Sequence, residues 1–208
     1  MTNIQKRILT SIIILPLSIF FVLKGEFFLV FFLFLIFLIG MYELVSVFKK
    51  KKSVILLSLI LVTSLFCIYY LRAISEYLLY FAIALTISSD IGGYIFGNIF
   101  KWKKLTKISP KKTYSGVLGS YFFSIICLLI WIELVYPTMQ FNVKFFLLTI
   151  IFSTVAQIGD LIISYFKRLE KIKDSGKILP GHGGIFDRID GLMFVVILAS
   201  FLGYLNII

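Results

Sequence analysis

The sequence predicts an all-α polytopic membrane protein with about seven transmembrane helices and an active site on its cytoplasmic side. Its 208 residues are 60% apolar and only 15% charged, whereas soluble domains are about 45–50% apolar and about 25% charged. The apolar residues form stretches long enough to cross a bilayer, and most cations lie between alternate stretches. The net charge of +11 fits three kinds of partner, which are nucleic acid, anionic lipid and phosphorylated substrate.

Each apolar stretch approaches the ~17–25 residues that a helix needs to cross a hydrocarbon core of about 30 Å. Lys6 and Arg7 before the first stretch are typical of a secretory signal, but no small-residue cleavage site follows them. Pro16 predicts a kink in the first helix. The expected spans are residues 8–23, 27–48, 54–71, 77–97, 117–136, 144–166 and 191–207.

The positions of the cations predict the orientation. One side of the membrane receives 18 of the 21 Lys and Arg residues, whereas Lys24, Arg72 and Lys144 fall on the other. Positively charged segments stay in the cytoplasm, so we expect the N-terminus inside and the C-terminus outside. We divide the chain into N-terminal transmembrane helices, residues 1–75, and a catalytic transmembrane region, residues 76–208.

Two cytoplasmic loops carry most of the candidate chemistry. Residues 101–116 read KWKKLTKISPKKTYSG, and residues 167–191 read KRLEKIKDSGKILPGHGGIFDRIDG. The second loop holds five of the 14 glycines, and glycine lets backbone N–H groups come close to a ligand. A flexible turn is the plain alternative, but the charged residues around the glycines favour a site.

Two acids inside apolar spans point to the same place. Asp90 and Asp160 each lie seven residues before the end of their apolar segments, which is about 10 Å below the cytoplasmic helix ends. Burying an ionisable group there costs at least ~2.5–3.5 kcal/mol, so a functional role is the first hypothesis. The alternative is a helix-packing hydrogen bond with Ser88 or Ser89. Carboxylates gathered beside the second loop favour a site for Mg²⁺, which prefers oxygen ligands.

Residues that follow Asp160 at helical spacing extend this pattern. They are Ser164, then Lys167 and Arg168, then Lys171. A continuous helix would place them on one stripe leading into the second loop. An acid within the membrane span, with cations nearer the membrane surface, is the arrangement expected for binding a metal-bound polyphosphate. The alternative is that these cations only contact lipid phosphates.

Several common catalytic motifs are absent from the sequence. It has no G-x-S-x-G elbow and no G-x-x-x-x-G-K-[ST] loop, which excludes α/β-hydrolases and P-loop NTPases. Cys67 and Cys127 lie in apolar runs with no second Cys or His nearby, so neither a disulfide nor a zinc site is expected. His182 in GHGG fits a phosphate-binding turn better than a catalytic triad.

The second loop, with the helix end before it, resembles the signature of the phosphatidate cytidylyltransferase (CDP-diacylglycerol synthase) family. The signature runs from Ser164 to Asp190, and SDIGGYIFG (89–97) and ISPKKT (108–113) are similar to two further stretches of that family. The resemblance covers the chain from about Ser88 onward. It implies a bacterial cytoplasmic-membrane enzyme that uses Mg²⁺ to convert CTP and phosphatidic acid into CDP-diacylglycerol and pyrophosphate. A second cation and a homodimer are left open, and no nucleic-acid partner is expected.

The resemblance also implies roles for individual residues. A lipid phosphomonoester has its second pKa at ~6 and is already largely ionised near neutral pH, so the reaction needs no general base. Catalytic roles fall on Asp160, Asp187, Lys167, Arg168, His182 and Arg188. Substrate binding falls on Ser109, Lys111, Lys112, Thr113, Ser164, Lys173, Gly181, Gly183 and Gly184. The expected metal ligands are Asp160, Asp187, Asp90, Asp174 and Asp190.

Two departures and two rival functions accompany this resemblance. Ser115 stands where the family usually carries Glu, so the role of that acid is absent or is supplied by Glu43 or another carboxylate. The N-terminal part is also shorter than in many family members. A CTP-dependent polyprenol kinase would share the nucleotide site but transfer the γ-phosphoryl group to a lipid alcohol. An ion-coupled transporter would also use intramembrane acids, but its site tends to lie at the bilayer midplane.

Overall fold

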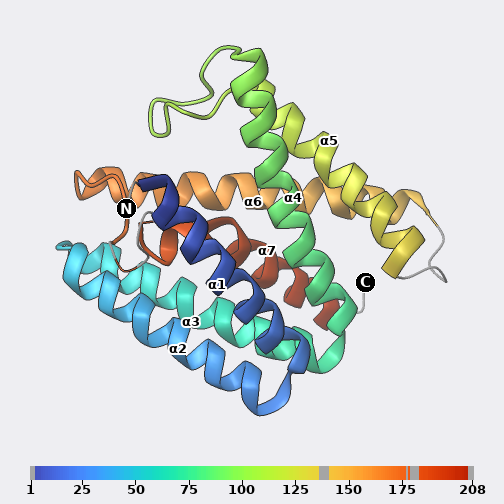
Figure 1. Cartoon of the computed structure of the whole chain (residues 1–208), viewed down its shortest axis with the longest axis horizontal. Coiled ribbons are helices and arrows are strands. Elements are labelled where there is room, and N and C mark those ends of the chain that lie inside the picture. The colour runs from blue at the N-terminus through green and yellow to red at the C-terminus, as the bar shows by residue number, and fades with distance from the viewer. Residues whose placement is uncertain (1–2, 136–140, 177, 179–182, 206–208) are drawn as a thin grey trace.

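The structure is a computed structural model that describes residues 3–135, 141–176, 178 and 183–205. These residues form seven α-helices joined by short turns and longer loops (Figure 1). The helices are α1 Asn3–Lys24, α2 Glu26–Val47, α3 Lys51–Ile74, α4 Glu76–Phe100, α5 Tyr114–Ile130, α6 Val143–Leu169 and α7 Phe186–Tyr204. A π-helical turn, Trp131–Val135, continues α5. The described residues contain no strand, and an isolated bridge pairs Lys104 with Thr113.

The all-α prediction is confirmed, because each expected span overlaps one helix, although residues 136, 206 and 207 of those spans lie outside the described residues. Five helices, α2 to α6 with the π-turn included in the fifth, are long and apolar enough to cross a membrane, and Ile12–Lys24 is a shorter apolar segment. The chain is therefore a multi-pass membrane protein. Pro16 lies inside α1, which continues through it.

The last helix differs from the others because its first turns are charged. The expected span began at residue 191, but α7 begins at Phe186 and so includes Asp187, Arg188 and Asp190. It packs against α3, α4 and α6, and Figure 1 shows it among them near the centre of the molecule. This helix therefore carries its acids into the interior of the bundle.

Apolar side chains both fill the bundle and cover it. One buried cluster joins α2, α3, α6 and α7 around Leu57, Ile163 and Phe186. A second cluster joins α3, α4, α6 and α7 around Leu85 and Phe152. Many other apolar residues on the helices are exposed, as expected for a surface that faces lipid.

Glycines bring α4 and α5 into backbone contact. A Cβ atom added at Gly92 or Gly119 would collide with the carbonyl oxygen of the other residue, and one at Gly116 would lie 2.9 Å from the oxygen of Gly93. Small residues allow this close approach between membrane helices. The contact fixes the two helices that carry the first loop, residues 101–113.

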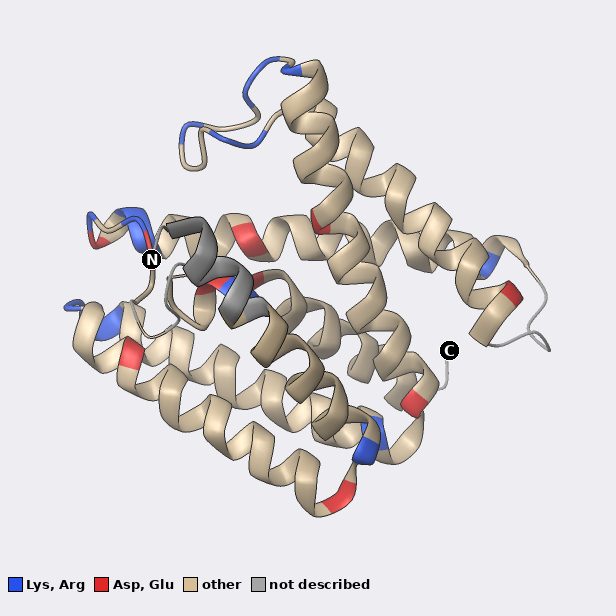
Figure 2. Ribbon diagram, in the orientation of Figure 1, with Lys and Arg blue, Asp and Glu red and all other residues tan. Residues whose placement is uncertain are grey.

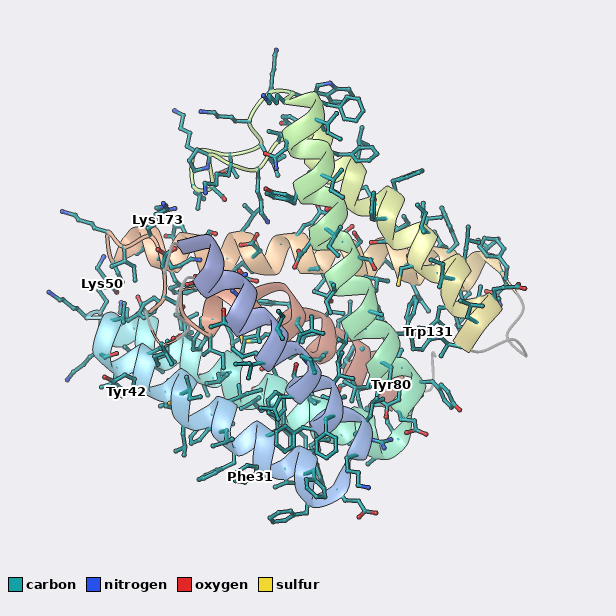
Figure 3. The ribbon with its side chains drawn as sticks, viewed as in Figure 1. Phe31, Tyr42, Lys50, Tyr80, Trp131 and Lys173 are labelled. Atoms are coloured by element: carbon teal, nitrogen blue, oxygen red, sulfur yellow. The ribbon has the colours of Figure 1, made fainter. Side chains whose placement is uncertain are left out.

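Charged residues mark the two opposite ends of the bundle. Figure 2 shows Lys and Arg concentrated in the first loop, in the turn between α2 and α3 and at the end of α6. Lys50 and Lys173 lie at this end in Figure 3, away from Tyr80 and Trp131. At the opposite end, Arg72 forms an ion pair with Glu76 and donates a hydrogen bond to the Leu23 carbonyl (3.4 Å). The Lys- and Arg-rich segments, which follow every second span in the sequence, thus lie together at one end of the bundle.

Candidate active site

Carboxylates from three helices come together beside the first loop. Asp160 on α6 and Asp190 on α7 lie within hydrogen-bonding reach of each other. Asp90 on α4 interacts electrostatically with both. We call Asp90, Asp160 and Asp190 the acidic cluster.

A lysine of the first loop reaches into the acidic cluster. Lys112 Nζ lies 2.6 Å from Asp160 Oδ2, and the two side chains are 23% and 29% exposed. The same ammonium donates to the Gln157 carbonyl oxygen at 3.1 Å. This ion pair is partly open to its surroundings, so a ligand can reach it.

Local structure in the first loop places Lys112. Its backbone N–H donates to the Ser109 carbonyl (3.0 Å), and its own carbonyl accepts from the N–H of Leu105 (2.8 Å). The next residue, Thr113, is the N-cap of α5 and accepts from the N–H of Gly116 at 3.1 Å. A turn on one side and a capped helix on the other thus hold this lysine.

Arg168 joins the two loops. Its Nε donates to the Ile108 carbonyl in the first loop at 3.2 Å, and a terminal guanidinium nitrogen donates to the Ile172 carbonyl in the second loop at 2.7 Å. The residue is exposed at the end of α6. It therefore fixes the two loops against each other beside the acidic cluster.

The predicted stripe along α6 is present up to the end of that helix. Ser164 Oγ donates to Asp160 Oδ1 at 3.3 Å, and Lys167 lies one turn further on. The helix ends at Leu169, and Lys171 has a positive φ of 57°. Lys171 therefore does not continue the stripe.

Asp187 has a different environment, although it lies only one turn before Asp190. Its Oδ1 accepts from Lys167 Nζ at 2.7 Å, and its Oδ2 accepts from the N–H groups of Ser175 (2.8 Å) and Gly184 (3.0 Å). The Lys167 and Asp187 side chains are only 9% and 10% exposed. This carboxylate therefore holds Ser175 and Gly184 of the second loop onto the end of α6.

Glu43 also takes part in this site, although the sequence indicated it only as a possible substitute for the acid that is absent at Ser115. It lies in α2 with 1% of its surface exposed, and it contacts the second loop rather than the region of Ser115. Its carboxylate accepts from the N–H of Ile185 at 2.8 and 2.9 Å and from Ser175 Oγ at 3.3 Å. The sequence contains a signal for this role, because Glu43 lies inside an apolar span just as Asp90 and Asp160 do.

The second loop is also tied to the turn between α2 and α3. Glu170 accepts hydrogen bonds from the backbone N–H groups of Lys49 and Lys50, both at 3.2 Å. Desolvation acts to raise the pKa of Glu170, but these bonds, together with Ser53, outweigh it and hold that pKa below its usual value. The loop is thus held by α2 and by the turn after it.

The alternative role of Ser89 in binding Asp90 does not apply. Ser89 Oγ instead bonds to Ser153 Oγ at 2.9 Å, and its carbonyl accepts from Ser120 Oγ at 2.8 Å. These bonds link α4 with α5 and α6. The hydroxyl of Ser89 therefore serves helix packing, while Asp90 is left to the acidic cluster.

The remaining predicted residues lie around these contacts. Arg188 interacts electrostatically with Asp90. Gly183 has a positive φ of 86°, and a Cβ added there would meet the Asp187 carboxylate at 2.8 Å. Ser109 and Thr113 are half-buried, whereas Lys111, Lys173 and Asp174 are exposed. His182 and Gly181 lie outside the described residues. Among the residues that are described, no group of three or more His, Cys, Asp or Glu side chains is arranged to hold a metal ion.

The fold and this site define a multi-pass membrane protein in which acids within the helices meet cations from the first loop and from the helix ends at one end of the bundle. A sequence model of the family described as the Cytidylyltransferase family matches residues 54–205. The chain belongs to this family, which confirms the resemblance of its signature. The match begins inside α3 and extends well upstream of Ser88, where the resemblance had begun.

The chain is also similar to curated bacterial proteins named phosphatidate cytidylyltransferase. That of Staphylococcus saprophyticus is 42% identical over 139 residues, which are 65% of this chain and 52% of the relative. That of Staphylococcus haemolyticus is 44% identical over 131 residues, which are 61% of this chain and 48% of the relative. The chain spans about half the length of the curated relatives it matches.

Proposed function

We propose that the protein is a phosphatidate cytidylyltransferase, which transfers CMP from CTP to phosphatidic acid and releases pyrophosphate. Membership of the family and the names of its relatives support this activity. The single observation that carries the proposal is the accessible contact between Lys112 and Asp160, with Asp190 within reach of Asp160. There the first loop meets acids of α6 and α7, where a lipid phosphate and a nucleotide can both reach.

The proposed reaction is an in-line displacement at phosphorus. An oxygen of the lipid phosphate bonds to the α-phosphorus of CTP as the bond from that phosphorus to the β-phosphate bridging oxygen breaks, and pyrophosphate leaves. The lipid phosphate is largely ionised near neutral pH because its second pKa is ~6, so no side chain has to remove a proton. Lys112, Arg168 and Arg188 orient the phosphates and offset the charge that develops on the leaving group.

We propose Asp160 and Asp190 as the residues that hold Mg²⁺. This ion is usually bound by one or two carboxylates together with water and substrate phosphates, so it does not require a group of three protein ligands. The donor set fits, because two carboxyl groups lie within reach of each other and Asp160 already has a cation, Lys112 Nζ, at 2.6 Å. Bound Mg²⁺ supplies neutralisation of the triphosphate charge. Asp90 is the candidate for a second cation, while Asp187 stays with the second loop.

The remaining parts of the site follow from the same proposal. Lys111 and Lys173 are exposed cations that can meet CTP or lipid phosphate. The GHGG sequence at 181–184 is proposed to bind nucleotide phosphates through its backbone N–H groups. We place the site on the cytoplasmic side of a bacterial cytoplasmic membrane, because the charged loops share that end of the bundle. A homodimer is compatible with this activity and is not required by it.

A product assay tests the proposal. The full chain, purified in detergent with phosphatidic acid, CTP and Mg²⁺, is expected to form CDP-diacylglycerol and equimolar pyrophosphate. A parallel reaction with a polyprenol should yield neither a phospholipid nor CDP. Production of CDP with a phosphorylated polyprenol would instead identify the kinase. No product from either acceptor, together with ion-driven uptake into vesicles, would identify a transporter.

A further inference from the structure

Glu43 accepts hydrogen bonds from the second loop and lies against two of its glycines. It lies one turn before the end of α2 and is 1% exposed. A Cβ atom added at Gly176 or at Gly184 would come within 2.5 Å of its carboxylate oxygens. The second loop is therefore shaped around this side chain, and only residues without a Cβ fit at these two points.

The carboxylate of Glu43 also caps α7, although it belongs to another helix. Ile185 precedes the first residue of α7 and offers no side-chain cap. The N–H of Ile185 donates to both oxygens of Glu43, at 2.8 and 2.9 Å, and the N–H of Phe186 donates at 3.4 Å. The first N–H groups of a helix lack partners within it, and a negative charge at that end is favourable. Glu43 thus fixes where α7 begins.

The start of α7 determines where the candidate catalytic groups lie. Asp187, Arg188 and Asp190 fall in its first turns, and Asp187 in turn holds Ser175 and Gly184 in the second loop. A change at Ile185 would therefore move Asp190 relative to Asp160. Glu43 has no contact with the acidic cluster itself, so its effect on that cluster has to pass through α7.

We propose that Glu43 is a positioning residue that sets the second loop and the first turn of α7 from α2. It lies upstream of residue 54, where the match to the family begins, so the N-terminal helices contribute to the site and do not serve only as an anchor. The kinetic part of this proposal rests on the proposed cytidylyltransferase activity. The structural part, order in the loop, does not.

The test uses three variants and two independent readouts. Glu43→Gln keeps the size of the side chain but loses its charge, and Glu43→Asp keeps the charge but shortens the reach. Glu26→Gln is the matched control, because Glu26 is an exposed acid at the other end of the same helix. For each protein we would measure hydrogen exchange over residues 183–190, and kcat and KM for CTP in the pyrophosphate assay.

The expected result separates positioning from global stability. Glu43→Gln should raise exchange at Ile185 and Phe186 and lower kcat/KM by about tenfold or more, with the change mainly in kcat and with exchange in α3 unaltered. Glu43→Asp should recover part of both effects, and Glu26→Gln should match the parent. If Glu43→Gln does not fold, Ser175→Ala removes only the hydroxyl contact with Glu43 and should show the same pattern at about two- to threefold.

Two outcomes would overturn the proposal. Unchanged exchange at Ile185 and Phe186 would mean that Glu43 does not order this segment. Raised exchange with an unchanged kcat/KM would mean that the order does not matter to the site. If the parent protein releases no pyrophosphate, the proposed activity fails, and the exchange data still decide whether Glu43 orders the loop.

Discussion

Asp187 and Asp190 lie three residues apart on α7, yet their surroundings are opposite. Asp187 accepts one hydrogen bond from an ammonium group and two from backbone N–H groups, in a pair that is about 10% exposed. Asp190 instead lies against the carboxyl group of Asp160 and interacts electrostatically with Asp90. A carboxylate whose hydrogen bonds are filled, such as Asp187, stabilises the loop. A carboxylate that lies close to other carboxylates, such as Asp190, is available to bind a cation.

The two sites differ in the free energy that a substitution would change. Removing one partner from a buried, hydrogen-bonded ion pair costs about 3–5 kcal/mol, because the other charge is left buried alone. Neighbouring carboxylates instead repel one another until a proton or a cation is bound. Substitutions at the two positions should therefore differ in whether they reduce stability or ligand binding.

The largest effect is expected at the acidic cluster. Asp160→Asn should lower kcat/KM for pyrophosphate release by about 10³-fold, because it removes the carboxylate that contacts both Lys112 and Asp190. The melting temperature in detergent should change little, since the site is partly open. Glu133→Gln, an exposed acid at the opposite end, is the control. Activity within threefold of the parent would contradict the assignment of Asp160.

A smaller loss of activity with a larger loss of stability is expected at Asp187. Asp187→Asn should lower kcat/KM by about 100-fold and lower the melting temperature, because Lys167 is left buried without its charge partner. Adding Lys167→Met should restore much of the melting temperature but not the activity. A double variant as unstable as Asp187→Asn would show that the ion pair is not what stabilises the loop.

The smallest expected effect is a shift in thermal stability caused by metal. Mg²⁺ with CTP should raise the melting temperature of the parent by about 3 °C or more when the ligands exceed their Kd about tenfold. Asp160→Asn should lose this shift, whereas Ser164→Ala, which removes only a 3.3 Å contact with Asp160, should retain most of it. Removal of the metal with EDTA should reverse the shift. An equal shift in Asp160→Asn would move the metal away from the acidic cluster.

The helices could be predicted because their signal is local. A long apolar stretch determines a span by its own length and hydropathy, and each expected span overlaps one helix. The grouping of cations at one end follows from the same alternation of spans and loops. The start of α7 was the exception, because its first turns are charged and their burial depends on Lys167 and Glu43.

The division of labour among the acids could not be predicted. Asp160, Asp187 and Asp190 have the same chemistry, and their spacing in the sequence gives no sign of which one meets backbone N–H groups. That choice depends on how the second loop folds back onto α6 and on which residue of α2 lies opposite it. Glu43 was visible as an acid in a span, but its partner Ile185 is 142 residues away.

The glycine contact between α4 and α5 has a mechanical consequence for Lys112. Gly119 touches α4 five residues after Tyr114, the first residue of α5, which is about 7.5 Å along the helix axis. A methyl group added at Gly119 would push α4 and α5 apart, and the displacement would increase toward the ends of these helices that carry the first loop. The position of Lys112 relative to Asp160 therefore depends on the close packing of α4 against α5. No charged residue takes part in that packing contact at Gly92 and Gly119.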